Sequence, residues 1–306
     1  MTTLLSMTTF TSADIPRLDG QTVIVTGASS GIGLATARAL AESGARVVLA
    51  VRNTGKGQTA AAAINGMTEV QELDLARLES VREFATRWDA PIDLLINNAG
   101  VGGRTLTRTA DGFEITLGTN HLGHFALTGL LLPHVTGRIV TVASQAERFA
   151  RLDLDDLNWQ RRPYQPSRAY NDSKLANLLF TAELQRRLTA AGSGVLANAA
   201  HPGLVATPIY HHDGPRRPVD LVWAVVNRLA AQNPDQGALP TLYAAVTEIP
   251  GDSFAGPSHL AHMRGAPELI GRSAAAQDPD LARRLWTASE RLTGVRYPLE
   301  PAPHPA

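Results

Sequence analysis

The sequence predicts an α/β fold with one doubly wound parallel sheet and helices on both faces. Short β-branched and aliphatic runs alternate with segments of helical periodicity, which is typical of parallel strands joined by right-handed crossovers. Glycine-rich or polar motifs follow several of these runs, where the carboxyl ends of parallel strands gather. No long linker or internal repeat interrupts the pattern, so we expect one domain over residues 18–295.

The first strand and helix show the pattern most clearly. The strand expected at 21–26 (QTVIVT) is short and β-branched, and a glycine follows it. The helix expected at 31–43 carries apolar residues at helical spacing until Gly44 ends it. Further strands are expected at 46–51, 70–73, 92–96, 137–143 and 195–200, and further helices at 54–65, 78–88, 110–132 and 168–191.

Both ends of the chain are expected to lie outside this domain. Residues 1–17 are expected to form a partly ordered lead-in, and the proline-rich residues 296–306 a loose tail. The lead-in lacks the basic start and long apolar core of a secretory signal. No uncharged apolar stretch reaches the length of about 18 residues that indicates a membrane span. We therefore expect no membrane anchor and a cytoplasmic protein.

The composition argues against several classes of function. The chain has 306 residues with 28 basic and 28 acidic side chains, whereas a duplex nucleic-acid binder usually carries a basic excess. Without cysteine there is no disulfide framework, no thiolate chemistry and no cysteine-based metal site. We expect no metal site from histidine either, because no acidic or thiol partner sits at matching spacing. The pairs His121/His124 and His211/His212 are interpreted as packed or surface residues.

A glycine-rich loop follows the first expected strand and opens the first expected helix. Its sequence is TGASSGIG at 26–33. Gly27 permits a tight turn, and Gly31 and Gly33 let the backbone approach a pyrophosphate and let the helix pack on the strand. The helix N-terminus then offers free N–H groups to phosphates. This loop predicts a dinucleotide-binding site that includes Ser29, Ser30 and Ile32.

The end of the second expected strand indicates which dinucleotide is bound. An acidic residue there accepts hydrogen bonds from the ribose hydroxyls in NAD-binding folds. This chain has Arg52 and Asn53 instead. An arginine can bind a 2′-phosphate, which favours NADP(H) over NAD(H). The alternative is that Arg52 is a solvated surface residue.

A tyrosine and a lysine share one face of the long helix expected at 168–191. Tyr170 and Lys174 are four residues apart. A phenol ionises near pH 10, and a neighbouring ammonium favours the phenolate, so such a pair can exchange a proton near neutrality. Ser144 ends the fifth expected strand, where its hydroxyl could hydrogen-bond a substrate oxygen. Together with the phosphate loop, the three residues indicate an active site.

With these motifs in order, residues 18–295 resemble the short-chain dehydrogenase/reductase family, whose Rossmann-type fold agrees with the predicted sheet. The loop at 26–33 is similar to the family's cofactor loop, and NNAG at 97–100 is similar to its motif after the fourth strand. In the retinol-dehydrogenase-like subgroup the second strand commonly ends in Arg-Asn and NADP(H) is the usual cofactor. The stretches that resemble this subgroup are TNHLGHF (119–125), LDLDDLNW (152–159), AYNDSKLANLLF (169–180) and FAGP (254–257).

The resemblance implies roles for particular residues. Asn120 matches the helix asparagine that holds a water of a proton relay. Asp74 matches the carboxylate that contacts the adenine of the cofactor. Pro202 and Gly203 match the turn beside the nicotinamide. Thr207 matches a residue that contacts the nicotinamide carboxamide or the cofactor phosphate. The implied catalytic residues are Asn120, Ser144, Tyr170 and Lys174. The cofactor-binding candidates are Gly27, Ser29, Ser30, Gly31, Ile32, Gly33, Arg52, Asn53, Asp74, Leu75, Asn98, Ala99, Gly100, Tyr170, Lys174, Pro202, Gly203, Val205 and Thr207.

Two connections are expected to lie near the substrate. Ser144 and Tyr170 are 26 residues apart, and the segment between them is expected to form a flap or outer wall. In the family, the region at 207–220 covers the substrate as a lid. The paired arginines of these two segments are interpreted as solvated charges; they are Arg161, Arg162, Arg216 and Arg217.

The motifs predict an NADP(H)-dependent oxidoreductase that interconverts a carbonyl group and an alcohol by hydride transfer, with Tyr170 as the acid/base. The expected substrate is a small apolar aldehyde, ketone or alcohol. Two alternatives stay open: a C=C double-bond reductase of the same family, and a non-catalytic NADP-binding sensor. The resemblance also implies a homodimer or homotetramer that pairs through the helices at 110–132 and 168–191.

Overall fold

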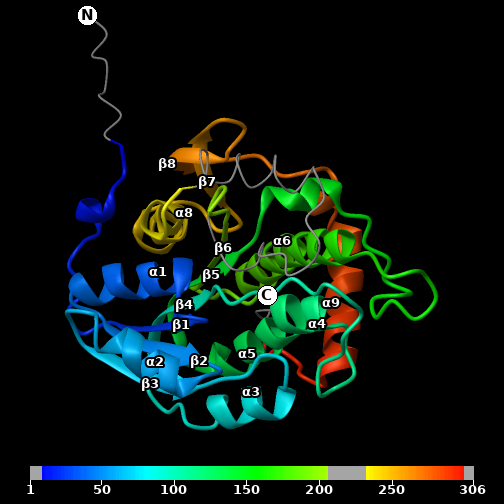
Figure 1. Ribbon diagram of the computed structural model, residues 1–306, viewed down its shortest axis with the longest axis horizontal. Coiled ribbons are helices and arrows are strands. Elements are labelled where there is room, and N and C mark those ends of the chain that lie inside the picture. The colour runs from blue at the N-terminus through cyan, green and yellow to red at the C-terminus, as the bar shows by residue number, and fades with distance from the viewer. Residues whose placement is uncertain (1–8, 206–231, 300–306) are drawn as a thin grey trace, which may run out of the picture.

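A computed structural model describes residues 9–205 and 232–299 of the chain. Their strands form one sheet in the order β3-β2-β1-β4-β5-β6-β7-β8 (Figure 1). All neighbours pair in parallel except β7 and β8, which are antiparallel. The predicted doubly wound sheet is confirmed. The strands are β1 (Thr22–Thr26), β2 (Arg46–Val51), β3 (Thr68–Glu72), β4 (Ile92–Asn97), β5 (Val135–Val142), β6 (Leu196–Ala200), β7 (Phe254–His259) and β8 (Arg264–Leu269).

Helices cover both faces of the sheet (Figure 1). The longer ones are α1 (Gly31–Glu42), α2 (Thr54–Ala61), α3 (Leu78–Ala85), α5 (Gly123–Leu131), α6 (Pro166–Ala190), α8 (Pro234–Val246) and α9 (Pro279–Thr293). Short helical turns are η1 (Ser12–Asp14), α4 (Ile115–Leu117), η2 (Gly118–Leu122), η3 (Leu132–His134), η4 (Gln145–Phe149) and η6 (Ala275–Gln277).

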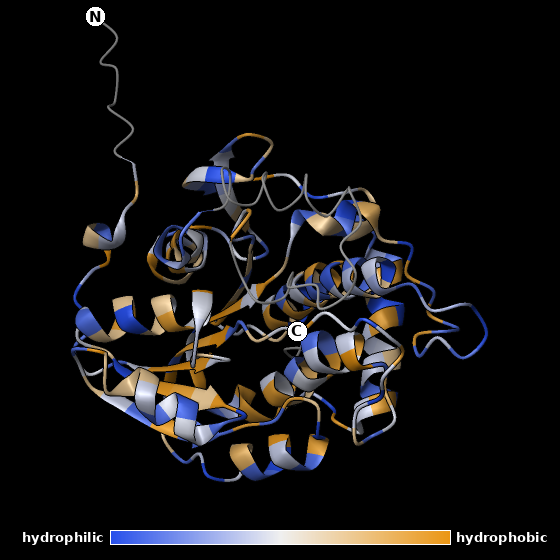
Figure 2. Ribbon diagram, in the orientation of Figure 1, coloured by the Kyte–Doolittle hydropathy of each residue, from blue (hydrophilic) through white to orange (hydrophobic). Residues whose placement is uncertain are grey.

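The strands are buried on both faces because their side chains alternate between two cores. In β1, Val23 and Val25 pack in a cluster with α1, α2 and α8, whereas Ile24 packs in a cluster with α3, α5, α6 and α9. Figure 2 shows this distribution: hydrophobic residues follow the strands and the helix sides that face them. Such strands read as continuous apolar runs, which is why the sequence shows them clearly.

One expected helix differs from its prediction. The sequence predicts a continuous helix at 110–132, but helical structure begins at Ile115, where buried Glu114 accepts hydrogen bonds from the N–H groups of Thr116 and Leu117. A π-helical turn, η2 (Gly118–Leu122), then separates α4 from α5. Single π-turns inside helices are frequent at functional sites. This one contains Asn120.

The longer elements near the C-terminus lie beyond the sequence prediction; they are α8, β7, β8 and α9. For α9 the local signals are nevertheless present. Asp278 caps its first turn by accepting hydrogen bonds from two backbone N–H groups, Pro279 opens it, and Gly294 ends it with φ of 68°. For β8, which pairs with β7 at the edge of the described sheet, the sequence RGAPEL carries no strand pattern.

The start of the expected loose tail is packed into the core. The Tyr297 hydroxyl donates a hydrogen bond to the Phe125 carbonyl at 2.7 Å. Its ring lies 4.4 Å from the ring of Trp286 and 5.0 Å from that of Phe125, between centroids. This aromatic cluster joins α5 to α9 and extends the domain to Leu299. Residues 300–306 lie outside the described part of the chain.

Candidate active site

The candidate residues gather beyond the carboxyl ends of β1, β4, β5 and β6. After β3 the chain returns to pair β4 with the other side of β1, in the register Val23 to Leu94. Ligands bind in the crevice at such a reversal of strand order. The loops after β1 and β4 lie next to each other there, and the loops after β5 and β6 continue the edge.

The glycine-rich loop has the shape that a phosphate requires. Gly27 and Gly31 have φ of 67° and 58°, a region that favours glycine. A Cβ added to Gly33 would lie 2.4 Å from Asn98 Nδ2 and 2.6 Å from the Gly27 carbonyl oxygen, whereas one added to Gly31 would meet nothing within 4 Å. Ser30 makes no side-chain cap to α1, so the first N–H groups of that helix are free to bind an anion. These residues fit a dinucleotide pyrophosphate.

Thr26 fastens the glycine-rich loop to the turn after β4. Its hydroxyl accepts hydrogen bonds from the N–H groups of Asn98 at 2.9 Å and Ala99 at 3.0 Å. In return, Asn98 Nδ2 donates to the Thr26 carbonyl at 2.8 Å. A Cβ on Gly27 would lie 2.9 Å from Ala99 Cβ, so the two segments are in contact. The structure therefore brings together the candidates of the 26–33 and 97–100 motifs.

The candidates at the ends of β2 and β3 differ in their local roles. Asn53 caps α2, since its Oδ1 accepts a hydrogen bond from the Lys56 N–H at 2.9 Å. Arg52 is exposed and has no ion-pair partner among the described residues. Asp74 is half-buried and accepts a hydrogen bond from the Ala76 N–H. Arg52 is the only cation among these three residues, and its guanidinium is free to meet a ligand phosphate.

Ser144, Tyr170 and Lys174 converge at the end of β5. Ser144 follows this strand directly, and its Oγ accepts a hydrogen bond from the Ala146 N–H at 3.2 Å. Lys174 Nζ donates to the Val142 carbonyl at 3.0 Å and lies 5.6 Å from the centroid of the Tyr170 ring. Burial lowers the pKa of Lys174 to about 8, so its ammonium is still charged at neutral pH. Helix α6 thus presents a phenol and a cation beside a strand-end serine.

Asn120 completes this group from the π-helical turn. Its Oδ1 accepts a hydrogen bond from the Val101 N–H at 2.8 Å, and its Nδ2 donates to the Val101 carbonyl and to Ser173 Oγ, both at 3.0 Å. A Cβ on Gly100 would lie 3.4 Å from Asn120 Oδ1 and 3.8 Å from Lys174 Nζ. The asparagine and the lysine therefore flank the same glycine, and all four catalytic candidates meet at one place.

The turn after β6 packs beside the glycine-rich loop. Gly203 has φ of 77°, and a Cβ there would lie 2.5 Å from the Met263 carbonyl oxygen. A Cβ on Gly237 of α8 would meet Val205 at 2.5 Å and Ile32 at 3.4 Å, so both side chains reach the same part of α8. Thr207, the expected lid at 207–220, His211, His212, Arg216 and Arg217 lie outside the described residues.

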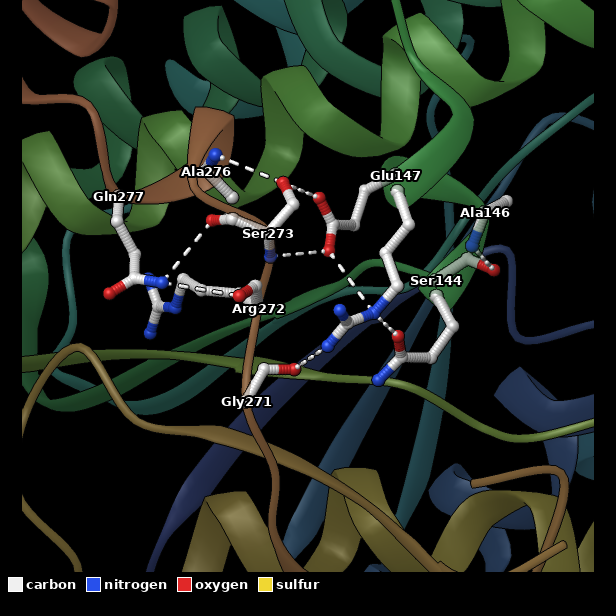
Figure 3. Close-up of polar contacts among 10 residues, drawn as sticks. Ser144, Ala146, Glu147, Gly271, Arg272, Ser273, Ala276 and Gln277 are labelled. Atoms are coloured by element: carbon white, nitrogen blue, oxygen red, sulfur yellow. Dashed lines mark hydrogen bonds and ion pairs between the residues drawn. The ribbon is translucent and has the colours of Figure 1, made fainter. Parts of the chain in front are cut away.

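The connection between Ser144 and Tyr170 is anchored by Glu147, a residue that the sequence patterns do not single out. This glutamate is buried, and its carboxylate accepts hydrogen bonds from the N–H and the hydroxyl of Ser273 (Figure 3). Arg148 Nη2 donates to the Gly271 carbonyl at 2.9 Å. Figure 3 shows how these contacts hold the 271–277 segment against the turn that begins at Ser144. The spacing of charges along the sequence does not distinguish Glu147 from an exposed glutamate.

Arg162, expected to be a solvated charge, is instead packed inside this connection. Its guanidinium stacks 3.9 Å from the centroid of a Trp159 ring and lies 3.5 Å from carboxylate oxygens of Asp156 and Asp172. Asp172 lies on α6 between Tyr170 and Lys174 in sequence, so Arg162 ties the flap to the helix that carries them. The expectation is wrong because it ignored the two carboxylates and the aromatic ring that folding brings to this arginine.

Both histidines of the 119–125 stretch are packed in the interior. His121 Nε2 lies 2.8 Å from Ser289 Oγ, and burial lowers the pKa of this imidazole to about 3. His124 contacts Thr26 and Asn120, and burial lowers its pKa to about 4. Across residues 9–205 and 232–299, no group of three or more histidine or acidic side chains could hold a metal ion.

Comparison with known proteins agrees with this geometry. Residues 21–217 match the family model of short chain dehydrogenases. The chain belongs to the short-chain dehydrogenase/reductase family. It is 42% identical to retinol dehydrogenase 13 of Homo sapiens over 299 residues, which cover 92% of this chain and 87% of that protein. Like the family, it is an NAD(P)-dependent oxidoreductase acting on CH–OH or C=O groups, and within the family it is retinol-dehydrogenase-like.

Solved structures of the family show the same architecture. An uncharacterized protein from Mycobacterium paratuberculosis is 50% identical and superposes with a TM-score of 0.83, covering 95% of this chain and all of that one. A protein described as an NAD(P)-dependent gluconate 5-dehydrogenase from Beutenbergia cavernae, solved with NADP at low occupancy, is 28% identical with a TM-score of 0.58. That match covers 75% of this chain and 90% of the other. None of the helices in the described part of this chain is long and apolar enough to span a membrane.

Proposed function

We propose that this short-chain dehydrogenase/reductase interconverts an apolar aldehyde or ketone with its alcohol, using NADP(H) and Tyr170 as the acid/base. One observation carries the proposal: Ser144, Tyr170, Lys174 and Asn120 meet at the end of β5, next to a loop that fits a dinucleotide. A sensor that only binds the cofactor would need the loop but not these four residues together.

Each of the four residues has a distinct role in the proposed reaction. When bound, the cofactor supplies or accepts the hydride. Tyr170 donates its phenolic proton to the carbonyl oxygen during reduction and takes the hydroxyl proton during oxidation. The Lys174 ammonium favours the phenolate electrostatically and would hydrogen-bond the hydroxyls of the cofactor's nicotinamide ribose, while Ser144 would orient the substrate oxygen. Asn120 links Lys174 to solvent through a water.

The substrate and reaction class are tested by following NADPH oxidation with matched aldehydes, ketones and enones. We expect turnover of apolar aldehydes or ketones, because the related dehydrogenase is named for retinol, an apolar alcohol. Activity on enones with the carbonyl left intact would favour the C=C reductase instead. NADPH binding without turnover of any of the three classes would favour the sensor.

The preference for NADP(H) is assigned to Arg52. We expect Arg52→Asp to raise KM for NADPH by about 10- to 100-fold, the range of one charge-assisted hydrogen bond to a phosphate. KM for NADH should change much less, since NADH has no 2′-phosphate for the guanidinium to meet. Arg284→Asp, an exposed arginine on α9, is the matched control and should alter neither value. An unchanged ratio of the two KM values in Arg52→Asp would remove Arg52 from this role.

A further inference from the structure

His124 lies between two parts of the candidate site that are far apart in sequence. Its side chain is buried in the first turn of α5, with 1% of its surface exposed. Nδ1 lies 3.0 Å from the Asn120 carbonyl oxygen, and Nε2 lies 2.9 Å from Thr26 Oγ1. One ring thus contacts both the π-helical turn and the end of β1.

These contacts determine which ring nitrogen carries the proton. A carbonyl oxygen only accepts, so Nδ1 must donate to Asn120. Burial keeps the ring neutral by lowering its pKa to about 4, so Nε2 carries no proton and accepts from the Thr26 hydroxyl. The other acceptor near that hydroxyl, the Ile96 carbonyl, is farther away at 3.3 Å.

The hydrogen bonds therefore form one chain with a single direction. The N–H groups of Asn98 and Ala99 donate to the Thr26 hydroxyl, which donates to His124 Nε2, and His124 Nδ1 donates to the Asn120 carbonyl. Hydrogen bonds in such a chain polarise and strengthen one another. The chain starts at the turn that would line the cofactor and ends at the asparagine of the proposed relay.

His124 bonds a residue whose side chain is fixed beside Lys174. Both hydrogens of the side-chain amide are used, by the Val101 carbonyl and Ser173 Oγ, and Oδ1 accepts from the Val101 N–H. The backbone carbonyl has two lone pairs, and His124 takes one of them. The hydrogen bond from the imidazole therefore helps to hold the π-helical turn from which this side chain extends.

We propose that His124 is a positioning residue that couples the cofactor-lining turn at Asn98 and Ala99 to the π-helical turn that carries Asn120. This inference rests on the proposed function, since His124 is proposed to hold the cofactor-lining turn and the turn of Asn120 in place for that reaction. The two ring nitrogens have separate roles. Nε2 holds Thr26 and through it the cofactor turn, whereas Nδ1 holds the π-helical turn of Asn120.

Two conservative variants separate these roles. The amide of His124→Asn can replace Nδ1 but does not reach Thr26, so NADPH should bind about tenfold more weakly while kcat at saturating NADPH stays within about twofold. The longer His124→Gln can replace Nε2, so NADPH affinity should hold while kcat falls about tenfold. In His124→Gln the solvent deuterium isotope effect on kcat should also rise, because proton transfer through the relay becomes limiting.

His121 provides the matched control, because it is buried in the same segment but bonds Ser289 of α9 instead of the site. His121→Asn and His121→Gln should lower the thermal unfolding temperature as the His124 variants do, without separating NADPH affinity from kcat. If the His124 variants change both quantities together, or only as much as the His121 variants do, the imidazole is a packing residue and the proposal is overturned.

A measurement on the unmodified protein tests the proposal even where a variant does not fold. Nitrogen-15 chemical shifts of the histidine rings report which nitrogen is protonated, and the His124 signal is assigned by its loss in a variant or by its slow exchange. We expect the Nδ1–H form, and an Nε2–H form would overturn the proposed chain. Failure of the unmodified protein to bind NADPH or turn over carbonyls would instead contradict the proposed function, and it would leave the ring measurement intact.

Discussion

Replacing Tyr170 with phenylalanine is expected to lower kcat by about 10²- to 10⁴-fold, the range that a positioned general acid contributes. The phenyl ring keeps the packing of Tyr170 on α6 but cannot donate or accept the proton. Affinity for NADPH, measured by fluorescence titration, should change little, because the glycine-rich loop and Arg52 are untouched. A combined loss of turnover and retained binding would separate chemistry from cofactor binding.

Tyr243→Phe is the control for this experiment. Tyr243 lies on α8, where its ring packs edge-on against Phe10 at 5.4 Å, away from the residues assigned to the reaction. Removal of that hydroxyl should leave kcat unchanged. Near-normal turnover of Tyr170→Phe with bound NADPH would contradict the proposed mechanism and require another proton donor.

Gly33→Ala is expected to weaken NADPH binding by about 100-fold or more and to lower stability by about 1–3 kcal/mol, the usual cost of forcing a group into a packed site. The added Cβ would lie 2.4 Å from Asn98 Nδ2 and 2.6 Å from the Gly27 carbonyl oxygen. Neither neighbour is free to move away from the added Cβ, because Asn98 Nδ2 is bonded to the Thr26 carbonyl and Gly27 lies in the loop itself. Thermal unfolding and NADPH titration measure the two effects.

Gly194→Ala provides the comparison, since a Cβ at that glycine would meet nothing within 4 Å and the backbone there does not require glycine. Its unfolding temperature and NADPH affinity should equal those of the unmodified protein. If Gly33→Ala also behaved like the unmodified protein, the loop could not have the close packing against the 97–100 turn that the structure shows.

The local patterns of the sequence predicted much of the architecture. Strands such as 46–51 are buried on both faces, so their β-branched runs stand out, and the predicted bounds agree with β2. The interruption of the helix expected at 110–132 could not be predicted. The start of the helix depends on the buried Glu114, which caps it. Its π-helical turn depends on contacts of Asn120 with Val101 and Ser173. Short-range periodicity contains neither interaction.

Among the site residues, the sequence by itself determined those whose identity follows from backbone geometry or chemistry: glycines at 27 and 31 with positive φ, and a Tyr-x3-Lys pair on one helix face. Only the tertiary structure decided which charged and polar groups face one another. The sequence alone suggests a surface position for Arg162, but in the fold it is ion-paired. The partner of Glu147 is Ser273, which is 126 residues away in sequence. The partner of His124 is Thr26, which is 98 residues away. The physical reason is burial: a polar group removed from water must find a hydrogen-bond partner, and that partner is set by packing across the chain and not by neighbours along it.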